Sequence, residues 1–179
     1  MRLNCYAGET ATPPPFTLRG AGADDAEALG ALLAASYARL LAPDYPPAVL
    51  DAALPRITMA QPELLAAPGY LVAEAGGGEI VAAGGWTWRG PAGGAAPLDW
   101  AHVRHVAVHP DLAGAGLGRL IVTQAADTAR EAGVRVLSCL STLTARGFYR
   151  RMGFADLGEV ELSLAPGVGF PAVQMRKVL

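Results

Sequence analysis

The sequence predicts one α/β domain, with a mixed, mostly antiparallel sheet of about six to seven strands and helices on both faces. Three features of the 179 residues support this fold class. Short β-rich runs in the first half are joined by glycine-rich turns, as in hairpins. Past mid-chain, a strand, a glycine turn, a helix and a second strand follow one another, and a last strand pair closes the chain. A chain of this length can bury the core of one ordinary domain.

The first half of the chain begins with a segment that lacks the signals of a helix or strand. Residues 1–15 end in three consecutive prolines, which predicts a flexible N-terminal extension before a single domain at 16–179. Asp24 and Asp25 open a helix that runs to about residue 41, with Glu27 completing a capping box. We assign these carboxylates to helix-dipole stabilisation rather than to catalysis. The other expected elements are a strand at 16–19, a helix at 47–59, and hairpin strands at 70–74 and 80–88.

Glycine and proline signals divide the second half into short elements. A loop rich in Gly, Pro and Ala is expected at 89–97, and Gly133 ends the longest helix of this half. The expected elements are a strand at 100–108, a glycine-rich turn at 110–118, a helix at 117–132, a strand at 134–140, a helix at 145–152, and strands at 159–164 and 170–177.

The composition excludes several classes of protein. The net charge is −2 and the basic residues are scattered, so a nucleic-acid partner is not expected. No apolar stretch approaches the roughly 20 residues needed to span a bilayer. Two cysteines, Cys5 and Cys139, are too few for a disulfide scaffold or a clustered metal site. Because only four residues precede Cys5, a lipoprotein signal is not expected either, and the prediction is a reduced, cytoplasmic protein without a metal.

The glycine turn predicts an anion-binding site. The first N–H groups of a helix have no internal partner, and the helix dipole places partial positive charge at this end. Gly114, Gly116 and Gly118 lack side chains, so a diphosphate can approach the backbone, and Arg119 adds a cation. A P-loop would need Gly-Lys-Ser/Thr at the helix start, and a dinucleotide-binding turn would need a different glycine spacing near the first strand. For the glycines alone, a tight turn without a ligand stays an alternative.

Two motifs in the right order resemble the GNAT superfamily of N-acetyltransferases. Residues 103–110 (VRHVAVHP) followed by 113–119 (AGAGLGR) resemble its strand and Arg/Gln-x-x-Gly-x-Gly/Ala turn. Residues 145–154 (ARGFYRRMGF) resemble its second motif, in which a tyrosine precedes Gly-Phe. The resemblance covers about residues 16–179, and the tail at 169–177 is similar to a bacterial branch of the family.

The resemblance implies that acetyl-CoA is the cosubstrate and that the two central parallel strands splay apart. The pantetheine arm would enter this gap, where a backbone N–H would donate to the thioester oxygen. Ala113 stands where the family has Arg or Gln, so we expect weaker cofactor affinity, and Thr142 stands where many members have Asn. The implied cofactor-binding residues are Val106, Ala107, Val108, Ala113, Gly114, Ala115, Gly116, Leu117, Gly118, Arg119, Thr142, Ala145 and Tyr149.

Tyr149 and His102 are the expected catalytic residues. Tyr149 matches the family position of the acid that protonates the thiolate, because a phenol with a pKa near 10 keeps its proton at neutral pH. Its alternative role is core packing. His102 is the candidate base, since some histone-modifying members carry a glutamate there. Strict strand alternation would place His102 with Arg104 on one face and His105 on the other, so that only one of these histidines faces the substrate.

Other side chains receive weaker assignments. His109 is expected to be a turn residue, and Cys139 a buried strand residue, because direct transfer needs no covalent enzyme intermediate. Four aromatic residues could line the acceptor pocket or pack in the core. They are Tyr37, Tyr45, Trp86 and Trp88.

The implied function is direct transfer of an acetyl group from acetyl-CoA to a small-molecule or peptide amine. The alternatives are a non-catalytic acetyl-CoA-binding domain with the same fold and a nucleotide-binding protein with a Rossmann-type sheet. The glycine spacing argues against the latter. The identity of the amine stays open, and a homodimer is a family-level expectation.

Overall fold

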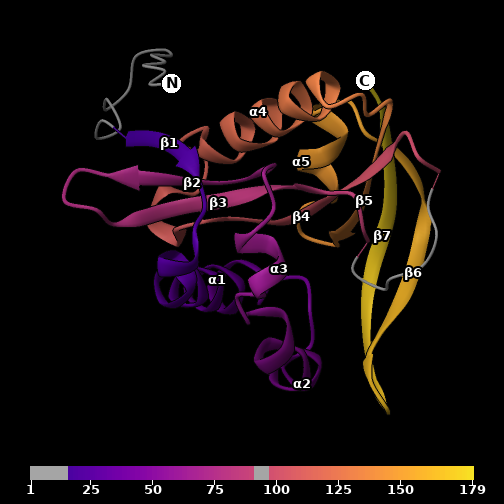
Figure 1. Cartoon of the computed structure of the whole chain (residues 1–179). Coiled ribbons are helices and arrows are strands. Elements are labelled where there is room, and N and C mark those ends of the chain that lie inside the picture. Colours follow the sequence, from indigo (N-terminus) through magenta and orange to yellow (C-terminus); the bar gives the residue numbers. More distant parts are fainter. Residues whose placement is uncertain (1–15, 91–96) are drawn as a thin grey trace.

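The computed structural model describes residues 16–90 and 97–179, which form one seven-stranded sheet with helices on both faces (Figure 1). The extension expected at 1–15 and most of the loop expected at 89–97 lie outside these residues. The strand order is β1-β2-β3-β4-β5-β7-β6, and every neighbouring pair is antiparallel except β4 and β5. The strands are β1 (Phe16–Gly20), β2 (Tyr70–Ala75), β3 (Ile80–Thr87), β4 (Trp100–Val108), β5 (Val136–Thr142), β6 (Ala155–Ala165) and β7 (Val168–Val178).

The helices divide between the two faces of the sheet. Figure 1 shows α1, α2 and α3 below the sheet and α4 above it. A short helix of four residues, α3, was not expected, and it begins at a proline that fits the first helical position. The helices are η1 (Ala23–Asp25), α1 (Ala26–Leu40), α2 (Pro47–Ile57), α3 (Pro62–Leu65), η2 (Pro110–Leu112), α4 (Leu117–Glu131) and α5 (Arg146–Arg151), where η marks a 3₁₀ turn.

Each face of the sheet has its own apolar core. Leu29 and Leu33 of α1 pack with Tyr70 of β2 on one face. On the other face, Val122 of α4 packs with Leu137 of β5, in a cluster that also contains Tyr149 and Phe154. The two layers hold the central strands firmly from both sides, which fixes the backbone of β4 and β5 around the site.

The start of α1 differs from the expected capping box. The helix begins at Ala26 after a 3₁₀ turn, and Asp25 uses its carboxylate elsewhere. Arg19 of β1 donates to both Asp25 oxygens at 2.8 Å, and the Gly22 N–H donates to Asp25 Oδ2 at 2.8 Å. The Asp25 carboxylate therefore ties the helix entry to the first strand, and the Arg19 guanidinium lowers its pKa.

The two central parallel strands separate along their length, as expected. Their register pairs are Trp100 with Val136, Ala101 with Leu137 and His102 with Ser138. Beyond these pairs, β4 stays paired with β3 as far as Val108, and β5 stays paired with β7 as far as Thr142. One edge of β4 thus faces a gap in the middle of the sheet.

The outer strand β6 is irregular and acidic. Its register with β7 shifts twice, between Asp156 and Gly158 and between Ser163 and Ala165. Gly158 has φ 119°, which is a conformation that glycine adopts readily. Arg146 and Arg150 of α5 both donate to Asp156 at 2.6 Å, which ties this strand to the helix before it.

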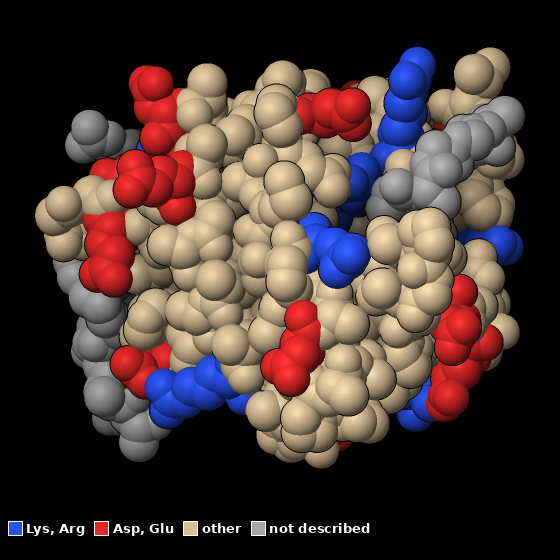
Figure 2. Space-filling model, turned by 90° about the horizontal axis from the view of Figure 1, so that it is seen from below, with Lys and Arg blue, Asp and Glu red and all other residues tan. Residues whose placement is uncertain are grey.

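Within the described ranges, no helix is long and apolar enough to cross a membrane. Figure 2 shows the face seen from below, where uncharged side chains cover most of the surface. Acidic side chains lie mostly toward the edges of this face, and several basic ones gather between its upper right edge and its centre.

Candidate active site

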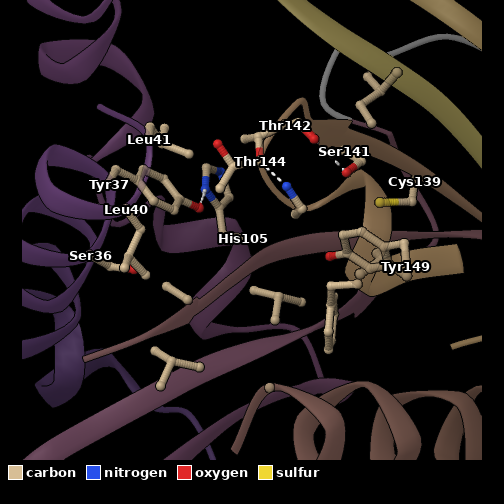
Figure 3. A pocket seen from close by; sticks show the side chains of 18 of the residues that line it. Ser36, Tyr37, Leu40, Leu41, His105, Cys139, Ser141, Thr142, Thr144 and Tyr149 are labelled. Carbon is tan, nitrogen blue, oxygen red and sulfur yellow. Dashed lines mark hydrogen bonds between the residues drawn. The ribbon is translucent and has the colours of Figure 1, made fainter. Parts of the chain in front are cut away.

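A pocket of about 1020 Å³ lies where β4 and β5 separate. Its walls come from both halves of the sheet and from the helices on each side. Figure 3 shows Tyr37 of α1 and His105 of β4 on one side, and Cys139 of β5 with Tyr149 of α5 on the other. Residues of α1 therefore line the same cavity as the separated strands and the glycine loop, although α1 is far from both in the sequence.

The glycine loop at the start of α4 has the open backbone that the sequence predicted. Gly114 and Gly116 have φ values of 87° and 89°, which L residues adopt only with strain. A Cβ placed at either residue would meet no atom within 4 Å. Gly118 differs, because its Cβ would contact Phe148 at 3.5 Å. The first two glycines therefore leave free space beside the backbone, whereas Gly118 allows close packing of the helix.

The first N–H groups of α4 are available to a ligand. The earliest bond of the helix runs from the Leu120 N–H to the Gly116 carbonyl at 3.0 Å. Within the described part of the chain, the N–H groups of Gly116, Leu117, Gly118 and Arg119 have no acceptor. Unpaired N–H groups at the positive end of a helix of fifteen residues suit an anion.

A bulge in β4 corrects the expected alternation of its side chains. Ala83 of β3 pairs with Ala107 and Gly85 pairs with Arg104, so three steps of β4 oppose two steps of β3. The extra residue is accommodated at His105, which has φ 40°. As a result, Arg104 reaches Gln61 before α3 while His105 reaches α1 on the same side of the sheet. The prediction that His105 faces away from Arg104 is therefore wrong.

His105 and Tyr37 form a polar pair inside the pocket. Tyr37 Oη lies 3.4 Å from His105 Nδ1, and the two rings are stacked with centroids 6.5 Å apart (Figure 3). Burial, followed by the nearby charge of Arg104, lowers the pKa of His105 to about 4. The imidazole is therefore neutral at physiological pH, and its free nitrogen can accept a proton or a hydrogen bond.

Tyr149 and Cys139 form the opposite wall. Both are buried, and both belong to the apolar cluster under α4. Burial raises the pKa of the Cys139 thiol to about 12 and raises the pKa of Tyr149 well above its ordinary value. Both groups are consequently protonated at neutral pH. The thiol is thus unsuited to act as a nucleophile, which needs the thiolate form.

The expected cofactor-binding residues divide into those that line the pocket and those that do not. Val106, Ala107, Val108, Ala113, Gly114, Gly116, Gly118, Arg119, Thr142, Ala145 and Tyr149 all line the pocket. Ala115 and Leu117 do not, and the Leu117 side chain is buried in the apolar cluster between α4 and strands β2 and β3. Thr142 Oγ1 accepts a hydrogen bond from the Ala145 N–H at 3.2 Å, which orders the turn before α5.

His102 and three of the four aromatic residues lie away from the pocket lining. An added Cβ on Gly90 would meet the His102 ring at 3.0 Å, so that ring packs against the strand-end loop. Trp86 is in the core and Trp88 packs edge-on against it. Tyr45 is buried against Phe170, and of the four only Tyr37 lines the cavity.

Sequence reasoning missed the charge of the pocket. Of the described residues that line it, four are arginines and none is aspartate or glutamate. Arg104 had been placed on a strand face without a role. A charged residue in the middle of a β-rich run is the signal that could have marked it, because buried charges need a reason. The lining arginines are Arg56, Arg104, Arg119 and Arg151.

The fold and the site define a class of protein whose central sheet divides beside a glycine loop with unpaired N–H groups. A family model for the acetyltransferase (GNAT) family matches residues 34–154, which is more than half of the chain, and the protein belongs to this family. The expected membership is thereby confirmed.

Several solved structures of acetyltransferases have the same fold as this chain. An N-acetyltransferase of Rhodopseudomonas palustris is 23% identical, with 96% of this chain and 100% of that chain covered and a TM-score of 0.74. The PaiA N-acetyltransferase of Thermoplasma acidophilum, in complex with coenzyme A, is 13% identical over 92% and 99% of the two chains, with a TM-score of 0.70. A GNAT family acetyltransferase of Brucella melitensis, in complex with acetyl-CoA, is 23% identical over 79% and 83%, with a TM-score of 0.52.

Proposed function

We propose that this protein is an acetyl-CoA-dependent N-acetyltransferase that transfers the acetyl group to an amine by direct attack. The observation that carries the proposal is the continuity between two features of one pocket. The unpaired edge of β4 leads directly into the loop at Gly114 and Gly116, whose N–H groups and open space suit a diphosphate.

The residues present fit acetyl-CoA. The N–H groups at the start of α4 would hold the diphosphate, and Arg119 would add a positive charge. The β4 edge from Val106 to Val108 would pair with the amide-containing arm. Ala113 supplies no side-chain contact, so backbone donors carry this binding. When bound, acetyl-CoA supplies an acetyl group activated as a thioester.

Backbone and side-chain groups of this chain would then promote the transfer. A backbone N–H of the β4 edge would donate to the carbonyl oxygen as negative charge grows there. Tyr149 would donate its proton to the sulfur as the carbon–sulfur bond breaks. Burial raises the pKa of Tyr149, so the phenol is protonated at neutral pH and has a proton to give.

The proton lost by the amine is assigned to His105 rather than His102. His105 lines the pocket and is neutral, whereas His102 does not line it. The amine would enter this step in its neutral form, having lost its first proton to solvent. An imidazole with a lowered pKa then suffices, because the remaining N–H proton becomes strongly acidic once nitrogen has bonded to the carbonyl carbon. We expect His105→Asn to lower kcat and His102→Gln to leave it within about twofold. Equal losses in both variants would contradict the assignment.

Binding and turnover test the proposal in two steps. Acetyl-CoA should raise the melting temperature of the protein, because it binds only the folded state. Release of free thiol in the presence of amines should then report transfer. Tyr149→Phe should lower kcat about 10- to 1,000-fold with little change in acetyl-CoA affinity. A melting temperature unmoved by saturating acetyl-CoA would refute the proposal, and binding without thiol release for any amine would favour a non-catalytic domain.

The proposal also includes the compartment, the substrate class and the assembly of the enzyme. The small number of cysteines favours a cytoplasmic enzyme, and the scattered basic residues favour a small-molecule or peptide amine over nucleic acid. The similarity of the tail at 169–177 to a bacterial branch of the family favours a bacterial source. A homodimer is the expected assembly, and sedimentation of the purified protein would test it.

A further inference from the structure

Arg104 is a buried cation without an ion pair. Arg104 is 6% exposed, and no described carboxylate lies within 4 Å of its guanidinium. Burial lowers the pKa of Arg104, and the charge of Glu63, which stands farther away, raises it without forming an ion pair. Arg19 provides a contrast, because it is more exposed and still pairs with both Asp25 and Glu74 at 2.8 Å. A buried charge is unfavourable unless an opposite charge or several hydrogen bonds compensate it.

Neutral oxygens satisfy only part of the Arg104 guanidinium. One nitrogen, Nη1, donates to Thr87 Oγ1 at 3.3 Å and to the Arg89 carbonyl at 3.2 Å. The other, Nη2, donates to Gln61 Oε1 at 3.0 Å. A guanidinium carries five N–H donors, so two have no acceptor among residues 16–90 and 97–179. These contacts hold the group in place and leave donors for a further ligand.

Arg104 lies in the part of the pocket next to α1 and α3, which we call the acceptor side because His105, the proposed base, is there. Arg104 lines the cavity, and the next residue in β4 is His105. Its partner Gln61 precedes α3, on the face opposite α4. Arg119, by contrast, stands at the start of α4, where the diphosphate would bind. The two arginines therefore serve opposite sides of the cavity.

The pocket as a whole favours an anionic acceptor. Because no aspartate or glutamate is among its described lining residues and four arginines are, the charge of the pocket disfavours an amine that carries only positive charge. A carboxylate on the same molecule reverses this balance, and a guanidinium binds a carboxylate through two parallel N–H donors.

We propose that the acceptor is an amine that carries a carboxylate, in the simplest case an amino acid, and that Arg104 binds this carboxylate and thereby sets specificity. The inference rests on the proposed acetyltransferase function and adds the substrate class to it. Gln61 positions the guanidinium, and the carboxylate replaces the ion-pair partner that the folded chain lacks.

The direct test compares matched substrates on the wild-type protein. Each common L-amino acid is assayed for thiol release from acetyl-CoA beside its carboxamide and its decarboxylated amine. For at least one amino acid we expect kcat/KM about 10- to 100-fold above both matched compounds, because a charge-assisted hydrogen bond is lost in each. Equal or faster turnover of the two compounds that lack the carboxylate overturns the inference, and this comparison requires no variant.

Variants of Arg104 then locate the effect. Arg104→Met should raise KM for the amino acid and abolish the preference over its carboxamide, while Arg104→Lys should retain part of it. Acetyl-CoA affinity, measured by calorimetry, should be unchanged in both. A preference that survives in Arg104→Met places the carboxylate elsewhere and overturns the inference.

Failure of this inference and failure of the proposed function are distinguishable. If acetyl-CoA binds and only amines without a carboxylate react, the enzyme assignment stands and the substrate class is wrong. If no carboxylate-bearing amine reacts, the inference is overturned, and acetyl-CoA binding then decides the fate of the proposed function separately.

Discussion

At the scale of single residues, His105 is unusual in both its backbone conformation and its pKa. It is the non-glycine residue with positive φ among those that the structure describes, and its neutral form is stabilised by burial. Both features follow from the bulge in β4, which turns an additional side chain toward α1. The strand thus supplies Arg104 and His105 to one cavity.

The stability of the protein should report the buried His105. Its pKa is about 4 in the folded chain and about 6.5 when unfolded, so between these values the unfolded chain binds a proton that the folded chain does not. Stability should therefore fall as pH decreases from about 6.5 to about 4, by at most about 1.4 kcal/mol per pH unit. His105→Asn should show a shallower decrease in denaturant unfolding over this window, because asparagine tolerates positive φ and does not titrate.

Carboxylates such as Asp25, whose pKa is lowered by Arg19, contribute equally in both proteins and act mainly at lower pH. They therefore serve as an internal reference. Parallel pH profiles for wild type and His105→Asn would show that the imidazole titrates freely.

The limits of sequence reasoning are clearest at this scale. Alternation with a period of two places side chains correctly only in an uninterrupted strand, and nothing in the residues of β4 marks the bulge. The burial of Arg104 was missed for a related reason, since it depends on Gln61 and Thr87 from distant segments.

At the scale of elements, the loop before α4 was predictable because its glycines encode a local conformation. Gly116 precedes the helix at φ 89°, and Gly133 follows it at φ 88°. Neither would place a Cβ within 4 Å of another atom. The two residues therefore share a positive φ and open surroundings but lie at opposite ends of α4, and only Gly116 lines the pocket.

This pair allows a matched experiment on the cofactor site. Gly116→Ala and Gly133→Ala should each lower the free energy of unfolding by about 1–2 kcal/mol, because L residues are strained at these angles. Only Gly116→Ala should also weaken acetyl-CoA binding, measured by calorimetry, since its methyl group occupies the space left for the diphosphate. Equal affinities in the two variants would place the diphosphate elsewhere.

The limits of helices and strands were predicted best where glycine, proline or a regular apolar pattern marks the end of the element. The strand at 100–108 was predicted with its observed limits, and α4 ends near the glycine that marked its end. The strands β6 and β7 are longer than expected, each having eleven residues, because their pairing extends through weakly patterned residues at both ends. Helix α3 has only four residues, which is too short for a helical periodicity to appear.

At the scale of the whole molecule, the sheet consists of two halves joined at β4 and β5 by three residue pairs. Tyr45 adds a second connection across the gap. It lies between α1 and α2, donates to the Pro171 carbonyl at 2.8 Å and accepts from the Leu143 N–H at 2.8 Å. Its ring also stacks on Phe170, with centroids 4.7 Å apart.

Tyr45→Phe should therefore loosen the connection between the halves while keeping the stacked ring. Loss of the hydroxyl leaves the Leu143 N–H and the Pro171 carbonyl without this partner, which costs about 1–3 kcal/mol for each buried group left unpaired. Thermal unfolding should show a lower melting temperature, partly restored by acetyl-CoA, which binds across the same gap in our proposal. An unchanged melting temperature would mean that solvent replaces the hydroxyl at no cost.

The irregular outer strand β6 has a consequence for self-association. An exposed strand edge invites a second copy of the same edge to extend the sheet. Here two register shifts in the pairing with β7 make the outer strand irregular, so its backbone groups form no even row for a second copy. Continuous sheets that run through two copies are thereby disfavoured at this end, so any dimer of the chain has to meet through other surfaces.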